Sequence, residues 1–330
     1  YIFWVNVPIG ILAIIMGAIA FPKKQEVEAG AAHNFDILGS FLLMMTIIVW
    51  YAGISIGQTN GYLNPVVIAI TAFTIVLLII FILRARKQSN SVLNINLFKD
   101  KIFSLSIGVS IIASVANSFS NILLPFYLES YRGMSPAAAS IIMVGQPAIM
   151  VAVTPIAGFL GDRIDKALLN LIGMAIMVIS NIGYAWTTTV NLSPYLILIP
   201  VVLNGVAMGI VNSPNSALTM TNVPKDLLGA AGSISSLTRT IGMMSGYALA
   251  EGILFTYMSV AAGHVVNNYV KGQDASFLAG TQMAYYIGAI LTLVGVILAV
   301  GQMRTLRPKT SNNQGQLIHS LFHWTADEKA

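Results

Sequence analysis

Nine long apolar stretches dominate this sequence and constrain its fold more than any other feature. They lie near residues 1–21, 37–57, 62–83, 102–128, 136–160, 167–187, 193–216, 240–262 and 279–303. A bilayer core about 30 Å thick requires roughly 20 apolar residues in a helix. Runs of this length without strand-like alternation are typical of transmembrane helices. The sequence therefore predicts an all-α polytopic membrane protein, a helical bundle with about nine transmembrane helices.

The composition supports this prediction and excludes several kinds of chemistry. Hydrophobic residues make up 56% of the 330, and the mean hydropathy is +0.78, which is more apolar than a soluble domain of this size tolerates. The chain has no cysteine, so disulfides, thiolate metal sites and cysteine nucleophiles are excluded. The motifs HExxH and GxxxxGK[ST] do not occur in the sequence. We expect neither an enzyme nor a cofactor.

Basic residues predict how the chain is oriented in the membrane. If Tyr1 lies outside, Arg132 and Lys271 are the two basic residues on the outer face, and fifteen lie on the other face. An excess of Lys and Arg is typical of cytoplasmic loops. We therefore predict a multi-pass protein of the inner, cytoplasmic membrane with a cytoplasmic C-terminus. Because the basic residues gather on one predicted face, the net charge of +5 is poor evidence for a nucleic-acid partner, and we expect none. The fifteen residues are Lys23, Lys24, Arg84, Arg86, Lys87, Lys99, Lys101, Arg163, Lys166, Lys225, Arg239, Arg304, Arg307, Lys309 and Lys329.

The spacing of the apolar stretches groups them into parts. A single span at 1–21 is followed by a two-span segment with charged flanks at 22–101 and by six spans at 102–303. The polar tail at 304–330 is predicted to be disordered. Its His319 and His323 have no third ligand nearby, so we expect no metal site. Since the chain starts without methionine and has an odd number of spans, we interpret it as a fragment.

Four charged residues cluster between two apolar stretches, in the segment PIAGFLGDRIDKALLN at 155–170. This segment resembles the loop signature of the major facilitator superfamily, which runs Gly, any, Leu, small, Asp, Arg, any, Gly, and Arg or Lys. Asp165 departs from the pattern, because the family usually has glycine there. In that family such loops are thought to latch helical bundles together in one state and release them in another. The residues that match are Gly158, Leu160, Gly161, Asp162, Arg163 and Lys166.

Further segments are similar to the fourteen-span drug:proton antiporter branch of that superfamily. They are YIFWVNVPIG at 1–10, FDILG at 35–39, LLPFYLESYRGMSPAAAS at 123–140 and GAAGSISSLTRTIGMMSG at 229–246. The resemblance implies that the chain holds spans six to fourteen. It would contain the last helix of the N-terminal bundle, a two-helix insert and the C-terminal bundle. The implied function is proton-coupled efflux of amphipathic or cationic drugs by alternating access, with the missing N-terminal bundle as partner.

Two carboxylates are candidates for carrying the proton. Glu251 lies in the middle of the apolar stretch 240–262. Placing an ionisable side chain inside a membrane costs free energy, so such residues usually have a function. Glu129 lies near the outer end of the stretch 102–128. Structural alternatives remain open for both, since Glu251 could pair with a polar group of a neighbouring helix and Glu129 could be a solvated helix end.

Polar residues within the spans are candidates for a substrate cavity. The resemblance implies that spans 102–128 and 193–216 line the central cavity, and amides mixed with soft apolar groups suit varied amphipathic substrates. The same side chains could instead form hydrogen bonds between helices. Transport of a small metabolite by the same fold, or a truncated chain that does not transport, are the alternatives to drug efflux. The cavity candidates are Asn117, Asn121, Phe126, Gln146, Asn204, Met208 and Asn215.

Overall fold

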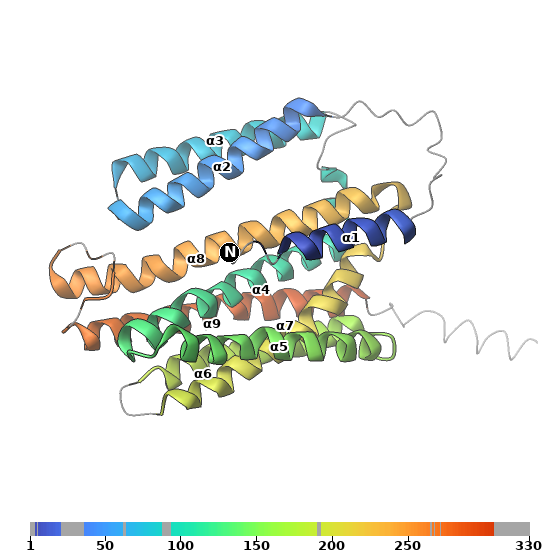
Figure 1. The fold of residues 1–330 in the computed structure, drawn as a ribbon. Helices are drawn as coiled ribbons and strands as arrows, with labels where there is room; N and C mark the ends of the chain where they lie inside the picture. Colours follow the sequence, from blue (N-terminus) through green and yellow to red (C-terminus); the bar gives the residue numbers. More distant parts are fainter. Residues whose placement is uncertain are drawn as a thin grey trace, which may run out of the picture. The chain divides into compact units, whose positions relative to one another are not determined.

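Helices form every regular element of the described part of the chain in this computed structural model (Figure 1). The structure describes residues 4, 6–20, 36–61, 64–87, 94–189, 193–264, 266, 268–270 and 272–306. The nine long helices are α1 (Asn6–Ala20), α2 (Ile37–Asn60), α3 (Pro65–Lys87), α4 (Lys101–Pro125), α5 (Pro136–Gly161), α6 (Lys166–Thr187), α7 (Leu198–Met220), α8 (Leu228–Ala262) and α9 (Asp274–Leu306). Each one overlaps one of the nine predicted apolar stretches. The predicted tail beyond residue 306 and the loop at 21–35 lie outside the described residues.

Seven helical segments of the described chain are long and apolar enough to cross a membrane. They contain α2 to α7 and α9, with α4 extended by a π-helical segment (Phe126–Tyr131) and α7 preceded by a 3₁₀ turn (Pro194–Ile197). Helix α1 has 15 residues and is shorter, and the 35-residue α8 is not among the seven. The prediction of an all-α multi-pass membrane protein is confirmed.

Local sequence signals explain where several bundle helices begin. The Asp100 carboxylate accepts a hydrogen bond from the Phe103 amide at 2.7 Å and caps α4. Ser135 caps α5 in the same way, with a proline at the first helical position. Asp165 accepts from the Ala167 amide at 2.9 Å and caps α6. Such caps satisfy backbone donors that have no partner inside the helix.

Helix α8 begins at Leu228, well before the apolar stretch that starts at residue 240. The added turns contain mostly small and polar residues, so a search for long apolar stretches does not include them. They stay helical because Ala231 and Ile234 are buried against Phe103 and Ile107 of α4. Arg239, which directly precedes that stretch, therefore lies within the helix.

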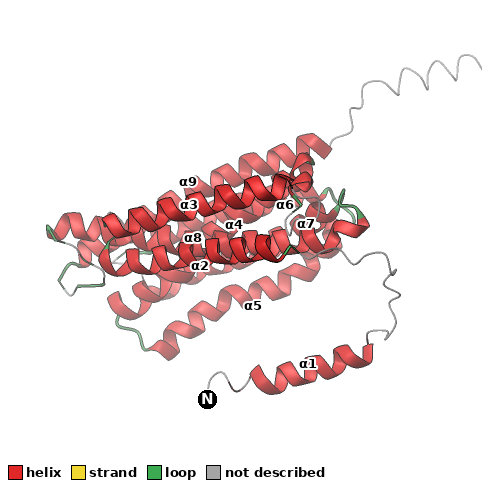
Figure 2. Ribbon diagram, turned by 90° about the horizontal axis from the view of Figure 1, so that it is seen from above, coloured by secondary structure: helices red, strands yellow, loops and turns green. Residues whose placement is uncertain are grey.

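The described chain divides into two units, Tyr1–Asp36 and Ile37–Ala330. The first contains α1. In the second, α2 and α3 pack against each other as a hairpin (Figure 2). An added Cβ at Gly53 of α2 would lie 3.0 Å from the side chain of Ile70 on α3, so the two helices approach closely.

Helices α4 to α9 form a bundle with internal repetition. Helix α4 packs on α8 and α9, as α7 packs on α5 and α6, and α6 packs on α9. This pattern maps onto itself when α4, α5 and α6 are exchanged with α7, α8 and α9. With three long helices in each group, the predicted topology has the second group enter the membrane from the side opposite to the first. Inverted repeats of this kind are a feature of many secondary transporters.

Two glycine pairs bring helices of the bundle into close contact. An added Cβ at Gly205 of α7 would lie 2.6 Å from the carbonyl oxygen of Gln146 on α5, and Gly209 similarly meets Val153. On α8, an added Cβ at Gly242 would lie 2.9 Å from the Ser114 side chain of α4. These glycines therefore allow close packing of the helices.

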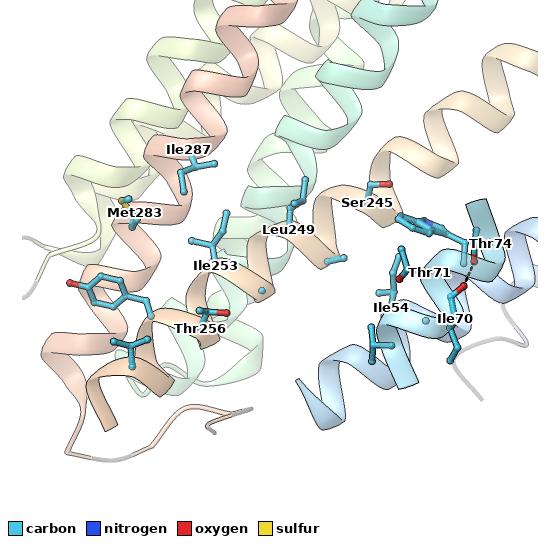
Figure 3. A pocket seen from close by; sticks show the side chains of 17 residues that line it. Ile54, Ile70, Thr71, Thr74, Ser245, Leu249, Ile253, Thr256, Met283 and Ile287 are labelled. Carbon is cyan, nitrogen blue, oxygen red and sulfur yellow. Dashed lines mark hydrogen bonds between the residues drawn. The ribbon is translucent and has the colours of Figure 1, made fainter. Parts of the chain in front are cut away.

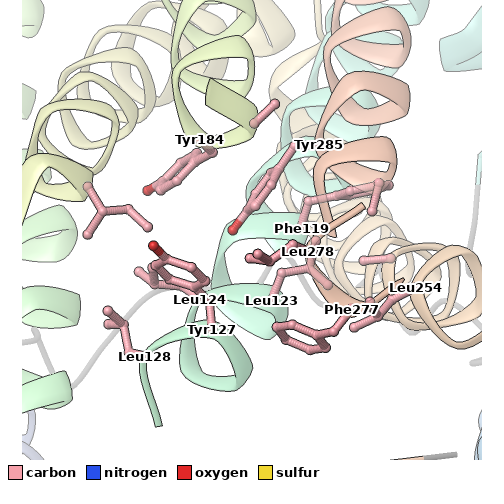
Figure 4. Packing of buried hydrophobic residues seen from close by; sticks show 14 of the residues in the cluster. Phe119, Leu123, Leu124, Tyr127, Leu128, Tyr184, Leu254, Phe277, Leu278 and Tyr285 are labelled. Carbon is pink, nitrogen blue, oxygen red and sulfur yellow. The ribbon is translucent and has the colours of Figure 1, made fainter. Parts of the chain in front are cut away.

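Aromatic side chains fill the core of the bundle (Figure 4). The rings of Tyr184 on α6 and Tyr285 on α9 stack with centroids 5.0 Å apart, and both side chains are fully buried. Tyr127, Phe119 and Phe277 are buried in the same cluster. The core thus joins α4, α6, α8 and α9.

Candidate functional site

Two predicted cavity residues meet between α4 and α5. The amide nitrogen of Gln146 donates a hydrogen bond to the side-chain oxygen of Asn117 at 2.5 Å, and both residues are half-buried. One turn further along α4, Asn121 is also half-buried. Phe126 is half-buried as well, and its ring meets that of Phe255 on α8 edge to face at 5.8 Å. Asn117, Asn121 and Phe126 thus follow one another along α4 and the π-helical segment after it, and Asn117 is hydrogen-bonded to Gln146 of α5.

Asn204 and Met208 lie deeper, on α7. Asn204 is 0% exposed, and neither polar atom of its amide has a hydrogen-bond partner among the described residues. Met208 packs in a buried cluster with Met174 and Met177 of α6. A buried amide without partners is costly, so Asn204 is an unusual residue of the bundle interior.

Asn215 lies in a buried polar network that joins four helices. Its amide nitrogen donates to the Ser106 carbonyl at 3.0 Å and the Ser110 hydroxyl at 2.9 Å. Its side-chain oxygen accepts from Asn170 of α6 at 2.9 Å and Gln302 of α9 at 3.2 Å. For Asn215, the alternative of interhelical hydrogen bonding is therefore what the structure contains.

A polar pocket of about 240 Å³ opens beside this network, between α4, α7 and α8. We call it the Arg239 pocket. It lies where α4 and α8 begin and α7 ends, the side predicted to face the cytoplasm. Met208 and Asn215 are the predicted cavity residues that contribute to it. Its lining is Ser110, Ala113, Ser114, Met208, Val211, Asn212, Asn215, Ser216, Thr219, Met220, Gly232, Ser235, Ser236 and Arg239.

Glu251 is buried in the structure, with 9% of its surface exposed. It follows Ala250 and precedes Leu254 on α8, and both of these are fully buried in the core. Along the α4–α8 contact, Gly246 lies against Ser118. The helical repeat therefore brings Glu251 to the level of the turn after Asn121. Glu251 lies nearer to the end than to the start of α8, and its depth in a membrane stays a prediction.

Glu129, the other candidate carboxylate, has a different environment. It lies in the π-helical segment that ends the α4 span, and its side chain is exposed. A π-helical turn is frequent at functional sites, but an exposed carboxylate at a helix end needs no special role. Of the two candidate carboxylates, Glu251 is therefore buried and Glu129 lies on the surface.

The loop between α5 and α6 is built as a tight turn. Asp162 is exposed at the end of α5, and the Arg163 guanidinium lies 4.3 Å from the centroid of the Phe159 ring. Lys166 opens α6 and is half-buried. The two glycines pack on α7, because an added Cβ would lie 3.3 Å from Ser213 at Gly158 and 3.9 Å from Pro214 at Gly161.

Two polar clusters in the structure have no counterpart in the sequence prediction. Asn170 and Gln302 belong to the buried network, and only their position inside apolar stretches signals them. At the opposite end of the bundle, Arg132 donates to the Tyr127 hydroxyl at 3.0 Å and to the Thr189 carbonyl at 2.7 Å. As one of two basic residues on the predicted outer face, Arg132 could have been singled out.

A larger groove of about 790 Å³ lies between the α2–α3 hairpin and helices α8 and α9 (Figure 3). Its walls are mainly apolar, with Ile54 and Ile70 on the hairpin and Leu249 and Ile253 on α8. Hydroxyls such as those of Thr71 and Ser245 interrupt this surface. None of the predicted site residues lines this groove.

Comparison with known proteins gives the family. The profile of the Major Facilitator Superfamily matches residues 1–247 and 108–325. The chain is 30% identical over 304 residues to the riboflavin transporter RibZ of Clostridioides difficile, covering 92% of this chain and 63% of RibZ. It is 24% identical to the multidrug resistance protein Stp of Mycobacterium tuberculosis, over 78% of this chain and 47% of Stp. A third relative is the uncharacterized transporter YebQ of Escherichia coli, 28% identical over 76% of this chain and 54% of YebQ.

RibZ and YebQ are transporters by name, Stp is a multidrug resistance protein by name, and the chain spans about half to just under two thirds of their length. The helical repeats, the loop between α5 and α6 and the profile match agree with one another. The chain belongs to the Major Facilitator Superfamily.

Proposed function

We propose that this chain is part of a proton-coupled transporter that exports amphipathic or cationic drugs by alternating access. The observation that carries the proposal is Glu251, a carboxylate that is 9% exposed on a bundle helix and lies in the apolar stretch 240–262. On insertion scales a charged side chain at the centre of a membrane helix costs about 2.5–3.5 kcal/mol, so such residues usually have a function. A carboxylate there can bind a proton in one state and release it in another. This is a transporter function and not an enzymatic one.

The packing of α4 to α9 supports movement of the bundle as a rigid body. The Asn215 network ties α4, α6, α7 and α9 together, and the glycine contacts hold α8 on α4 and α7 on α5. Alternating access rocks one such bundle against another around a site at mid-membrane depth. Asn117, Asn121, Phe126 and Gln146 line the part of α4 and α5 where we propose that substrate binds.

The partner bundle is the remainder of a fourteen-span protein in this proposal. Residues 1–21 would be its last helix, 22–101 a two-helix insert, 102–303 the C-terminal bundle and 304–330 a cytoplasmic tail. The exposed apolar side chains of α5 support a partner, because most of this helix is uncovered within the described chain. They include Ile141, Val144, Val151, Ile156 and Phe159. We place the protein in the inner, cytoplasmic membrane with the C-terminus inside.

The loop between α5 and α6 is the proposed latch between bundles. Gly158 and Gly161 hold it against α7, so a shift of α7 would move the loop. Asp162 and Arg163 are exposed and accessible to a second bundle, while Lys166 lies at the start of α6. The latch would hold the cytoplasmic side closed in one state and open in the other.

Transport of a small metabolite is a second candidate function, favoured by the 30% identity to a riboflavin transporter. To separate the two, everted membrane vesicles should carry the product of the complete reading frame that contains this chain. Uptake of ethidium and of riboflavin is measured with and without a proton gradient. Gradient-driven uptake of ethidium supports the drug exporter, whereas uptake of riboflavin alone supports the metabolite transporter. Uptake that ignores the gradient rejects proton coupling.

A further inference from the structure

The Arg239 pocket has an unusual balance of polar groups. Among the described residues, its lining includes one cation, several hydroxyls and no carboxylate. The hydroxyls come from three helices, for example Ser114 of α4, Ser216 of α7 and Ser236 of α8. Serine hydroxyls can donate hydrogen bonds to a bound group. The pocket therefore offers an excess of donors over negatively charged acceptors.

Arg239 differs from two other arginines of the bundle in lacking a partner. The guanidinium of Arg132 bonds to a hydroxyl and a carbonyl, and that of Arg163 lies over an aromatic ring. Within the described chain, Arg239 forms neither a hydrogen bond nor an ion pair, although it lines a pocket. A guanidinium remains charged at all physiological pH values and matches carboxylate and phosphate oxygens in geometry.

The pocket's immediate surroundings keep its polar side chains in position. The Asn215 side chain is fixed by the four hydrogen bonds described above, one of which Ser110 of the pocket lining accepts. On α8, the turns that carry Ser235, Ser236 and Arg239 are anchored by buried Ala231 and Ile234. A preformed wall of this kind loses little freedom when a ligand binds.

We propose that the Arg239 pocket binds an anionic group, a carboxylate or a phosphate, of the transported molecule. At about 240 Å³ the pocket is smaller than the roughly 300–1,000 Å³ of sites that enclose a whole drug-sized ligand. It therefore receives one group of a larger amphipathic substrate at the side where α4 and α8 begin. This inference rests on the proposed transport function and narrows it, since a substrate that fills the pocket carries an anionic group besides its apolar part.

Three probes of similar size and different charge test the proposal: benzoate, benzamide and benzylammonium. The purified 330-residue chain is placed in nanodiscs of zwitterionic lipid, and binding is measured by equilibrium dialysis against empty nanodiscs. We expect at least five-fold tighter binding of benzoate than of benzamide, and weaker binding of benzylammonium. Equal binding of all three, or a preference for benzylammonium, overturns the proposal.

Variants assign the effect to the pocket. Arg239→Gln should reduce benzoate binding to the level of benzamide, and Arg239→Lys should keep most of it. Arg163→Gln removes a positive charge from the loop between α5 and α6, outside the pocket lining, and should change nothing. If Arg239→Gln binds benzoate as the unaltered chain does, the proposal is wrong. Dialysis measures binding and needs no proton gradient. A failure of proton-driven transport would therefore not change the binding result, so the transport proposal and the pocket proposal can be rejected independently.

Discussion

Gly246 on α8 lies against Val115 on α4, so closely that an added Cβ atom would be 2.6 Å from the Val115 carbonyl oxygen. The same added atom would be 2.6 Å from the Ser118 side chain. Real Cβ atoms do not approach a backbone oxygen this closely, so a side chain at Gly246 must push the two helices apart. The α4–α8 contact, which flanks Glu251, thus depends on the absence of a single methyl group.

Gly246→Ala is therefore expected to lower the free energy of unfolding by about 1–3 kcal/mol, the usual effect of overpacking. Gly229→Ala is the matched control on the same helix, because an added Cβ there meets nothing within 4 Å. The control should be neutral or slightly stabilising. Thermal unfolding of both variants in detergent checks this, and equal midpoints would contradict the close contact.

Gln302→Leu is expected to lower the free energy of unfolding by about 1 kcal/mol, because it removes hydrogen bonds inside the membrane. Gln302 donates to Ser106 at 2.9 Å and accepts from Asn170 at 3.0 Å. Thr305→Val, on an exposed turn of the same helix, is the control and should have little effect. Combining Gln302→Leu with Asn215→Leu should cost less than the sum of the two, since they share a hydrogen bond. Strict additivity would argue against a network.

The positions of the helices could be predicted from the sequence because apolar length alone determines which segments cross a bilayer. The start of α8 could not, since Ala231 and Ile234 are held by contacts with α4 that no local pattern reveals. Burial of Glu251 follows from its place in a long apolar stretch. The partners of Asn215 do not, because Asn170 and Gln302 are distant in sequence and meet only after the helices pack.

Asp162→Asn is expected to slow transport without weakening substrate binding, because Asp162 is exposed on the proposed latch and lies outside the pocket lining. Asp165→Asn is the control, because it removes a negative charge from the same loop. Asparagine also caps helices, so the start of α6 should be kept. Initial rates and substrate affinity are measured for both. An unchanged rate for Asp162→Asn at normal expression would remove this residue from the latch.

Tyr269, in the loop between α8 and α9, should lose its hydroxyl proton at a higher pH than an ordinary tyrosine. Its hydroxyl donates a hydrogen bond to the Asp274 carboxylate, and this bond, together with burial and the negative charge of Asp274, raises the pKa of Tyr269 to about 12. The folded-state pKa lies above the unfolded value near 10, so the contribution to stability is complete below pH 10. It is lost as the pH rises from 10 to 12. The phenolate absorbance of the chain minus that of Tyr269→Phe measures this titration, and a midpoint near 10 would contradict the bond.

Glu251→Gln tests the central claim most directly. The substitution keeps the size of the side chain and removes the proton-carrying group. In proteoliposomes that hold the product of the complete reading frame, substrate accumulation driven by a proton gradient is compared with exchange of labelled for unlabelled substrate. We predict that Glu251→Gln loses accumulation and keeps exchange, whereas Glu129→Gln, at an exposed position, keeps both. Full gradient-driven accumulation by Glu251→Gln would contradict the assignment of Glu251 as the proton carrier.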